Sequence, residues 1–343
     1  MSLAIVTGAT GWLGRALCEA LLDGLKEVPS LATPPAGRKV RALVHGPTTG
    51  LDPRVEAIAG DLATGQGVDA LFEGAKGATV FHVAGVIHPS RGVKEFHEVN
   101  TEGTKRLLDA AKKAGVRRFI YVSSNSPIGT NGSPSEVFDE SAPYHPYMGY
   151  GRSKRAAEEA VLAAGKDLEI VIIRPPWFYG PRQPARQNTF FTMIRTGKGP
   201  LVGGGKNRRS MAYVDNICQG LLLCEKVEAA KGNVYWIADE RPYEMTEIID
   251  TVERLLEKEF NLPCTHGRLR LPGLASEMAY LVDATLQGVG LYHQKIHVLS
   301  EMNKTIACSV DKAKRELGYA PTVSLEEGMR RSIRWVLDNG GVI

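Results

Sequence analysis

The chain alternates between short apolar runs and longer segments with helical periodicity. The apolar runs are the length of buried strands and lie at 3–6, 39–44, 55–59, 78–83, 118–122 and 169–173. Between them, 66–76 and 97–114 carry apolar residues at helical spacing. Strands that alternate with helices predict an α/β fold, with a doubly wound parallel sheet covered on both faces. Two later segments, 210–226 and 233–238, are predicted to be a helix and a strand that return to this sheet.

The first strand leads into the glycine pattern "TGATGWLG", after which helical spacing begins. A strand, a glycine turn and a helix are the context in which such glycines bind a dinucleotide. Gly8 would make the tight turn, Gly11 would let the backbone approach a pyrophosphate, and Gly14 would let helix and strand pack closely. We expect the loop to contact the phosphates at the helix N-terminus. Its remaining predicted contacts are Thr10, Trp12 and Leu13.

The regular alternation of strand-like and helical segments ends after residue 174. Prolines and loops fill 175–209, so we expect a dinucleotide-binding domain of the Rossmann type over 1–174 and a smaller substrate-binding domain over 175–343. Within 271–291 one helical stripe is apolar and predicts a core or lid helix. A helix on a membrane surface is the lesser alternative, because the polar face lacks Lys and Arg. The stripe consists of Leu274, Met278, Leu281, Val282, Thr285, Leu286 and Val289.

Composition narrows the class of protein. The chain has 343 residues, 43% of them hydrophobic and 23% charged, and a net charge of +4 that is dispersed. Nucleic-acid binding needs an extended positive face, and one short basic cluster, 206–209, does not supply it. The five cysteines form no C-x-x-C pair, and neither they nor the histidines have metal-ligand spacing. With no signal peptide or membrane span predicted, we expect a cytoplasmic enzyme with reduced thiols, no metal and no membrane partner.

The stretch "GYGRSKRAAEE" places Tyr150 one helical turn before Lys154, so both side chains share a face. An ordinary amphipathic helix is the plain alternative. A free tyrosine, with a pKa of about 10, is a weak base at neutral pH. A nearby ammonium group favours the phenolate. Lys154 would therefore lower the pKa of Tyr150, so that Tyr150 can act as acid or base at a carbinol oxygen near neutral pH.

Motifs along nearly the whole chain resemble the extended short-chain dehydrogenase/reductase family. They are "TGATGWLG", "GDL", "VFHVAG", "VNTEGTKRLLDAA", "FIYVSSNSPIG", "YGRSK", "RPPWFYGP", "YVDN" and "LGYAPTVSLEEGMRRSIRWV". The resemblance implies that Tyr150 is the acid/base, Lys154 its partner and a serine of "VSSN" the third member. The spacing to Tyr150 favours Ser124 over Ser123, and a hydrogen-bonded serine pair that caps the strand is the alternative. Ser124 would donate to the substrate oxygen.

The resemblance also implies the other cofactor contacts. Asp61 and Leu62 occupy the "GDL" slot that meets the adenine, although a loop carboxylate that caps the next helix is the alternative. Asn100 is carried over as support for the active-site backbone. The remaining predicted contacts are Val83, Ala84, Gly85, Val122 and Pro175.

The second strand ends at "RALVHGP", with His45 where an acid would bind the adenosine ribose and select NAD. Without that acid nothing repels a 2′-phosphate, so NADP is slightly favoured over NAD. Arg15 and Arg41 are candidate phosphate contacts, or simply surface residues.

Two residues indicate different classes of substrate. Trp177 fills a slot in which the family's sugar-nucleotide epimerases carry Asn, and an aromatic there suits an apolar or ring-shaped substrate. Arg209 occupies the position where those epimerases bind a diphosphate. With Asn125 and Ser124, these residues form the predicted substrate site.

The stretch 269–318 looks more like the 3β-hydroxysteroid dehydrogenase-like branch, which favours a dehydrogenase/reductase of an alcohol or ketone. A nucleotide-sugar epimerase or dehydratase is the alternative. The complete Ser-Tyr-Lys trio argues against a non-enzymatic sensor. A homodimer through 97–114 and 150–164 is implied by the resemblance alone.

Overall fold

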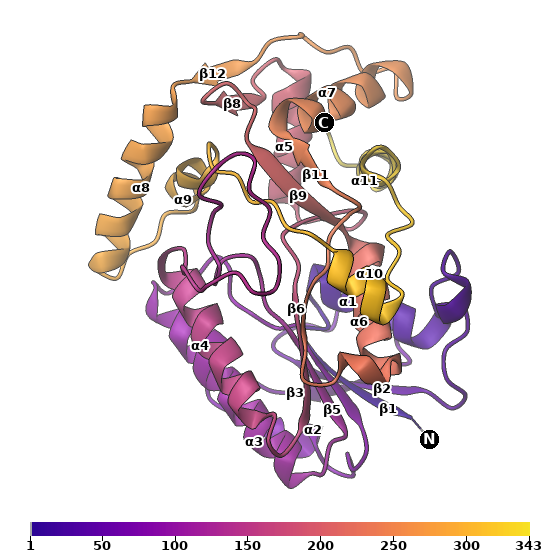
Figure 1. Ribbon diagram of the computed structural model, residues 1–343. Helices are drawn as coiled ribbons and strands as arrows, with labels where there is room; N and C mark the ends of the chain where they lie inside the picture. The colour runs from indigo at the N-terminus through magenta and orange to yellow at the C-terminus, as the bar shows by residue number, and fades with distance from the viewer. Residues whose placement is uncertain (1) are drawn as a thin grey trace.

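A sheet of seven parallel strands organises the protein, and the computed structural model describes residues 2–343. In spatial order the strands are β3 (Glu56–Ala59), β2 (Lys39–Val44), β1 (Leu3–Thr7), β4 (Thr79–His82), β5 (Arg118–Val122), β6 (Glu169–Arg174) and β10 (Val234–Trp236). The strand order reverses between β1 and β4, and in such sheets ligands bind in the crevice beyond the carboxyl ends of the strands at this point. The predicted doubly wound α/β fold is confirmed (Figure 1).

Helices cover both faces of the sheet because successive strand side chains point to opposite sides. Val6 packs in one core with α1 (Trp12–Asp23) and α6 (Val214–Lys226). Ile5 packs in the other core, with α2 (Val68–Leu71), α3 (Thr104–Lys113) and α4 (Met148–Ala164). A π-helical segment, η2 (Phe96–Gly103), runs directly into α3. The 3-10 turns η1 (Pro29–Leu31) and η3 (Glu228–Ala230) lie in connections.

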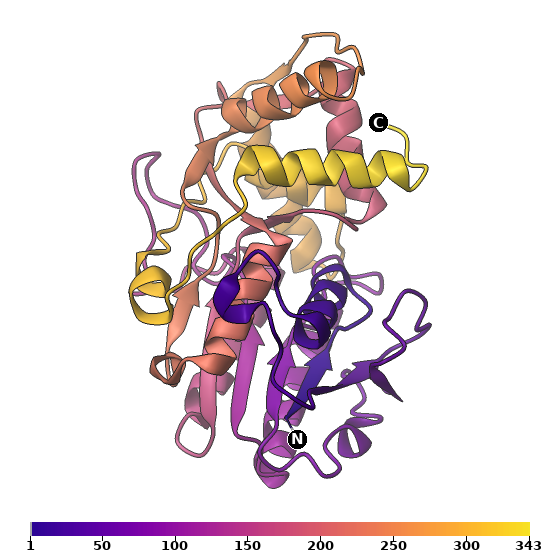
Figure 2. The same cartoon turned by 90° about the vertical axis from the view of Figure 1, so that its right-hand side faces the viewer.

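The second half of the chain builds a smaller layer beyond the carboxyl ends of the strands (Figures 1 and 2). One three-stranded sheet holds β7 (Trp177–Tyr179), β9 (Arg208–Tyr213) and β11 (Pro242–Glu244), and β8 (Pro200–Val202) pairs with β12 (Leu269–Leu271). The helices of this layer are α5 (Ala185–Arg195), α7 (Met245–Lys258), α8 (Gly273–Gly288), α9 (Gln294–Glu301) and α11 (Leu325–Asp338), whereas α10 (Asp311–Leu317) packs beside α6 and β10.

The segment 210–226 departs from the predicted helix. Its first residues belong to β9, and α6 begins only at Val214. Pairing of β9 with β7 on one side and β11 on the other holds this stretch extended, which local periodicity does not reveal. The predicted return to the main sheet is made by the other segment, 233–238, whose strand β10 pairs in parallel with β6.

The helix predicted over 271–291 forms as α8, but its apolar stripe is exposed, so of the predicted core or lid helix the core half was wrong. Leu274 and Leu281 are 67% and 65% exposed, and the buried face carries Ser276, Asp283 and Gln287 instead. These polar side chains form hydrogen bonds with one another and with α9. For example, Ser276 Oγ donates to the carbonyl oxygens of Leu299 and Ser300 at 2.9 Å. Within residues 2–343 no helix has both the length and the apolar character that a membrane crossing requires.

Candidate active site

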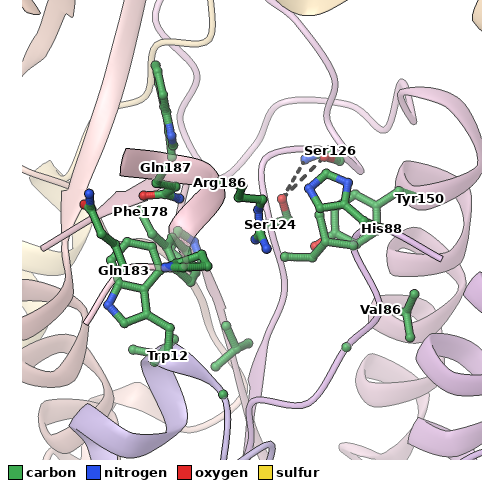
Figure 3. Close-up of a pocket in the computed structure, with 18 of the residues that line it drawn as sticks. Trp12, Val86, His88, Ser124, Ser126, Tyr150, Phe178, Gln183, Arg186 and Gln187 are labelled. Atoms are coloured by element: carbon green, nitrogen blue, oxygen red, sulfur yellow. Dashed lines mark hydrogen bonds between the residues drawn. The ribbon is translucent and has the colours of Figure 1, made fainter. Parts of the chain in front are cut away.

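A cavity of about 1350 Å³ opens where the carboxyl ends of the strands meet the second layer. Small-molecule sites usually measure roughly 300–1,000 Å³, so this cavity has room for a dinucleotide and a second ligand. In Figure 3 Trp12 and Phe178 lie on one side of it, and Ser124, Tyr150 and His88 lie on the other. The cavity therefore lies where the reversal of strand order predicts a ligand crevice.

The glycine loop forms the floor of this cavity. Gly8 has φ +76°, and a Cβ there would lie 2.8 Å from the backbone nitrogen of Ala84. A Cβ at Gly14 would lie 2.0 Å from the carbonyl oxygen of Gly8, so the helix could not pack on the strand with any other residue. No side chain caps the N-terminus of α1. Its free N–H groups and helix dipole suit the pyrophosphate of a dinucleotide, and the residues present fit that group.

Nearly all the residues predicted to bind the cofactor line this cavity. From the glycine loop and the first strands these are Gly8, Thr10, Gly11, Trp12, Leu13, Gly14, His45, Asp61 and Leu62. From later strands and α4 they are Val83, Ala84, Gly85, Val122, Tyr150, Lys154 and Pro175. Asp61 does not cap the next helix, α2, whose N-terminus has no side-chain cap. Its Oδ1 accepts instead from the N–H of Ala63 at 2.8 Å, within the loop after β3.

Asn100, predicted as a cofactor contact and as support for the backbone, is not among the residues that line the cavity. Its Oδ1 accepts from the N–H of Val86 at 2.7 Å, and its Nδ2 donates to Val86 O and Ser153 Oγ. These bonds tie the segment after β4 to α4. Asn100 therefore supports the backbone of the site, as its place in "VNTEGT" also suggested.

Tyr150 and Ser124 come together because α4 begins beside the end of β5. Burial raises the pKa of Tyr150 to about 12, although a hydrogen bond with Ser124 favours the ionised form. Ser124 Oγ also lies 3.4 Å from Ser126 Oγ (Figure 3). Ser123 reaches the cavity as well, but its buried Oγ has no hydrogen-bond partner within residues 2–343. The hydroxyl next to Tyr150 is thus that of Ser124.

Lys154 is buried one turn further along α4. Its Nζ donates to the carbonyl oxygen of Val122 at 2.8 Å and lies 4.4 Å from the centre of the Tyr121 ring. Burial lowers the pKa of Lys154 to about 7, against the opposing charge of Glu158. Lys154 was expected to depress the pKa of Tyr150, but within the protein burial dominates both groups and moves the tyrosine the other way.

Of the three residues considered for selectivity toward a 2′-phosphate, one lines the cavity and two do not. His45 lines the cavity after β2. Arg41 is turned away from it, because its Nε donates to Glu56 Oε2 at 2.9 Å and its Nη1 to the carbonyl oxygen of Glu73 at 2.6 Å. Arg15 donates to the carbonyl oxygen of Thr49 at 2.7 Å. Neither arginine lines the cavity.

The upper wall of the cavity combines aromatic rings with one buried cation. Trp177 and Phe190 pack edge to face, with ring centres 5.7 Å apart, and Phe178 packs against Trp12. Arg209 is buried, and burial lowers its pKa while the charge of Glu301 opposes that shift. Its guanidinium donates to the carbonyl oxygen of Glu301, and its Nε is buried without a partner within residues 2–343. Asn125 also lines the cavity.

Several other cavity residues carried no local signal in the sequence. Gln183, Arg186, Gln187, His297 and Glu301 come from the start of α5 and from α9, where the sequence pattern predicts only loops and helix. Among the histidines, His88 lines the cavity and His82 does not. His82 is buried between Thr7 and Thr104, at 2.7 and 2.8 Å, and burial lowers its pKa to about 3.

A family model described as "NAD dependent epimerase/dehydratase family" matches residues 4–238, well over half of the chain. The protein therefore belongs to this family, and the predicted membership is confirmed. An uncharacterized protein, y4nL, of Sinorhizobium fredii is 49% identical over 344 residues, which cover 98% of this chain and 96% of that one.

Relatives with assigned names are more distant. The 4-hydroxy-2-methyl-3-oxo-4-farnesyl-3,4-dihydroquinoline-1-oxide ketoreductase of Stigmatella aurantiaca is 30% identical, with 94% of this chain and 93% of that protein covered. A 3-beta-hydroxysteroid dehydrogenase of Mycolicibacterium neoaurum is 27% identical over 97% of this chain and 91% of that one. Among solved structures, DesIV, a dTDP-glucose 4,6-dehydratase from Streptomyces venezuelae with NAD bound, has a TM-score of 0.75 at 25% identity, covering 99% and 98% of the two chains. The chain is thus similar both to reductases and to nucleotide-sugar enzymes.

Proposed function

We propose that the protein is an NAD(P)-dependent oxidoreductase that acts at an alcohol or ketone carbon of a small apolar or cyclic substrate. The observation that carries this proposal is the meeting of Ser124, Tyr150 and Lys154 on a cavity wall that faces aromatic side chains. The relatives named as a ketoreductase and a hydroxysteroid dehydrogenase support it. The glycine loop supports the cofactor half of the proposal.

In this proposal the bound nicotinamide cofactor supplies or accepts a hydride. The raised pKa of Tyr150 keeps its phenol protonated at neutral pH, which is the form needed to protonate a ketone oxygen during reduction. Ser124 would hold that oxygen with a second hydrogen bond while negative charge develops on it. Lys154 would stabilise the phenolate left after proton transfer and bind the nicotinamide ribose. In the oxidative direction the same groups act in reverse.

The aromatic wall sets the expected substrate class. Trp177, Phe178 and Phe190 present ring faces and edges without a charged partner at their contacts. Such surfaces favour flat or cyclic apolar groups, because burial of aromatic area and ring contacts both contribute. The opposing alternative is a nucleotide-sugar epimerase or dehydratase, supported by the buried Arg209 and by the likeness to DesIV.

We expect NADPH to bind at least as tightly as NADH, because β2 is followed by His45 and not by a carboxylate that would repel a 2′-phosphate. Fluorescence titration of the two reduced cofactors measures this preference. His45→Asp should reverse it in favour of NADH, and Arg182→Gln, outside the cavity, serves as the control. A clear preference of the unaltered protein for NADH would contradict this part of the proposal.

Net cofactor consumption separates the two enzyme classes. With an apolar cyclic or aryl ketone, the proposal predicts a steady loss of NAD(P)H absorbance, because each turnover transfers a hydride out of the cofactor pool. UDP- and dTDP-sugars should give neither loss nor product. Trp177→Asn should weaken apolar substrate binding by about 1–3 kcal/mol through lost aromatic burial. Sugar-nucleotide conversion without net cofactor change, abolished in Arg209→Ala, would establish the alternative instead.

A further inference from the structure

A cluster of polar side chains lies on the cavity wall beside Tyr150, outside the Ser-Tyr-Lys trio. We call it the second polar subsite. His88, Arg186 and His297 line the cavity, and Tyr292, which does not, contacts both histidines. His88 Nδ1 and the Tyr292 hydroxyl share a hydrogen bond of 2.6 Å, and the rings of Tyr292 and His297 are 5.5 Å apart. Phe96 packs against both Tyr150 and Tyr292, at 5.9 and 5.8 Å between ring centres. The ring of Phe96 therefore separates the subsite from Tyr150, the proposed acid.

Arg186 supplies an unengaged positive charge at this subsite. In Figure 3 its side chain extends from α5 into the cavity, toward the side that carries Ser124 and His88. Within residues 2–343 no hydrogen bond or ion pair holds its guanidinium, in contrast to its neighbour Arg182, which pairs with Glu19 at 2.5 Å. A guanidinium group presents a planar set of donors that matches a carboxylate.

His297 supplies a donor whose orientation is fixed from behind. Its Nδ1 lies 2.7 Å from Oδ2 of Asp283, a carboxylate with no exposed surface. Gln287 Nε2 donates to both oxygens of that carboxylate at 3.0 Å, and Gln287 Oε1 accepts from the N–H of Gly149 at 2.9 Å, next to Tyr150. Because Nδ1 is held by Asp283, Nε2 is the ring nitrogen left for a ligand, and no residue of 2–343 bonds to it.

The charges around the subsite leave a positive excess. Asp283 compensates His297, and Glu301 lies close enough to Arg209 and His297 to act on the pKa of both. Burial opposes a charged imidazole, but the hydrogen bond of Asp283 and the charge of Glu301 raise the pKa of His297 above its ordinary value. Burial and the charges of Arg186 and His297 lower that of His88 to about 4, so His88 is neutral. The charge of Arg186 remains without an acidic partner.

We propose that the second polar subsite binds a carboxylate of the substrate, so that the protein acts on apolar keto acids or the corresponding hydroxy acids. This inference rests on the proposed reductase function and adds the substrate class. One free guanidinium and one fixed N–H match a single carboxylate, whereas a diphosphate would require more donors. Arg186 and His297 are substrate-binding residues in this assignment, and Asp283 is a positioning residue.

The experiment compares aryl keto acids with their methyl esters as substrates for NADPH-dependent reduction. The set contains phenyl ketones with two, three or four bonds between the ketone and the carboxyl group. For the best-fitting member we expect kcat/KM of the acid to exceed that of the ester about 10- to 100-fold, as a charge-assisted hydrogen bond would produce. Arg186→Met should reduce this ratio about 10-fold, and Arg182→Gln should leave it unchanged. Equal rates for every acid and its ester would overturn the proposal.

The pH profile tests the role of His297 separately from the charge of Arg186. The groups that face His297 are Asp283, Glu301, Tyr147, Tyr292 and His88. Burial raises the pKa of both tyrosines and lowers that of His88 to about 4, which moves all three away from neutral pH, whereas the pKa of His297 is raised toward it. When His297 loses its proton, Nε2 becomes an acceptor and repels a carboxylate. The acid-to-ester ratio should therefore fall as pH rises past the pKa of His297. His297→Gln and Asp283→Asn should abolish this dependence, and its persistence in both variants would assign it to another group.

A binding measurement keeps failure of the subsite distinct from failure of the reductase proposal. If no ketone is reduced, the proposed reaction is wrong, and calorimetric titration with 4-phenylbutanoate in the presence of NADP tests the subsite directly. Binding that weakens about 10-fold in Arg186→Met, and not in Arg182→Gln, would support the carboxylate site. Equal binding by both variants would overturn it. If esters and acids are reduced equally well, the reductase proposal is supported and the subsite is rejected.

Discussion

Replacing Tyr150 with phenylalanine is expected to lower turnover at least ~100-fold while cofactor binding stays close to that of the unaltered protein. The change removes the hydroxyl that would protonate the substrate oxygen and keeps the ring that packs against Phe96 at 5.9 Å. Initial rates of NADPH loss with a saturating aryl ketone measure the effect. Cofactor titration and thermal unfolding show whether the fold and the cofactor site are preserved.

Tyr280→Phe is the matched control, because this tyrosine lies partly exposed on α8 and does not line the cavity. It should leave turnover unchanged. Near-normal activity of Tyr150→Phe would remove Tyr150 from the proposed chemistry. The serine assignment has its own comparison, in which Ser124→Ala should lower turnover more than Ser123→Ala, since Ser124 is the serine that hydrogen-bonds with Tyr150. The reverse order would assign the role to Ser123.

Lys154→Met is expected to abolish measurable turnover and weaken cofactor binding while making the cofactor-free protein more stable. The buried ammonium costs free energy at neutral pH, as its pKa of about 7 indicates, and its replacement by an apolar side chain of similar length removes that cost. We expect the free energy of unfolding at pH 7 to rise by about 1–4 kcal/mol, measured by urea denaturation. A purely structural lysine would show the opposite sign.

The same variant predicts a pH dependence of stability. The pKa of Lys154 is about 7 in the folded protein and near its ordinary value of 10.5 in the unfolded chain, so the unfolded chain binds more protons between these values. The contribution of Lys154 to stability therefore improves as pH rises from about 7 toward 10.5. The stability gain of Lys154→Met should shrink over this window, and Lys105→Met, an exposed lysine paired with Glu102, should show no such trend. If the stability gain of Lys154→Met did not change with pH, better packing and not the loss of the buried charge would explain it.

The parts of the site that lie within one turn or one loop were predictable from residue spacing. The glycines at 8, 11 and 14 predicted the floor of the cavity, because backbone conformation and close approach depend on the absence of a side chain at those positions. Tyr150 and Lys154 were predicted to share a face because four residues make about one helical turn, and both line the cavity. The alternation of strand-like and helical segments predicted the parallel sheet, because each segment's type follows from spacing over a few residues.

Contacts between distant segments were not predictable. The apolar stripe of α8 predicted a core or lid helix, yet the buried face is the one whose Asp283 and Gln287 find partners on α9 and α4. Periodicity shows which residues share a face but not which face another element will cover. Arg186 gave no signal either, because its position in the cavity depends on where α5 sits over the sheet.

By itself, the sequence determined the doubly wound sheet, the glycine loop, the placement of Tyr150 and Lys154 on one cavity wall and the membership of the family. Each depends on interactions over a few residues or on motifs read in order. Only the tertiary structure decided the protonation of the site and the identity of its far wall. The pKa values of Tyr150 and Lys154 follow from how completely the surrounding elements exclude water, and burial outweighs the mutual effect that spacing alone suggested. The subsite of Arg186 and His297 likewise exists only because α5, α8 and α9 meet beyond the carboxyl ends of the strands, where side chains far apart in the chain face one cavity.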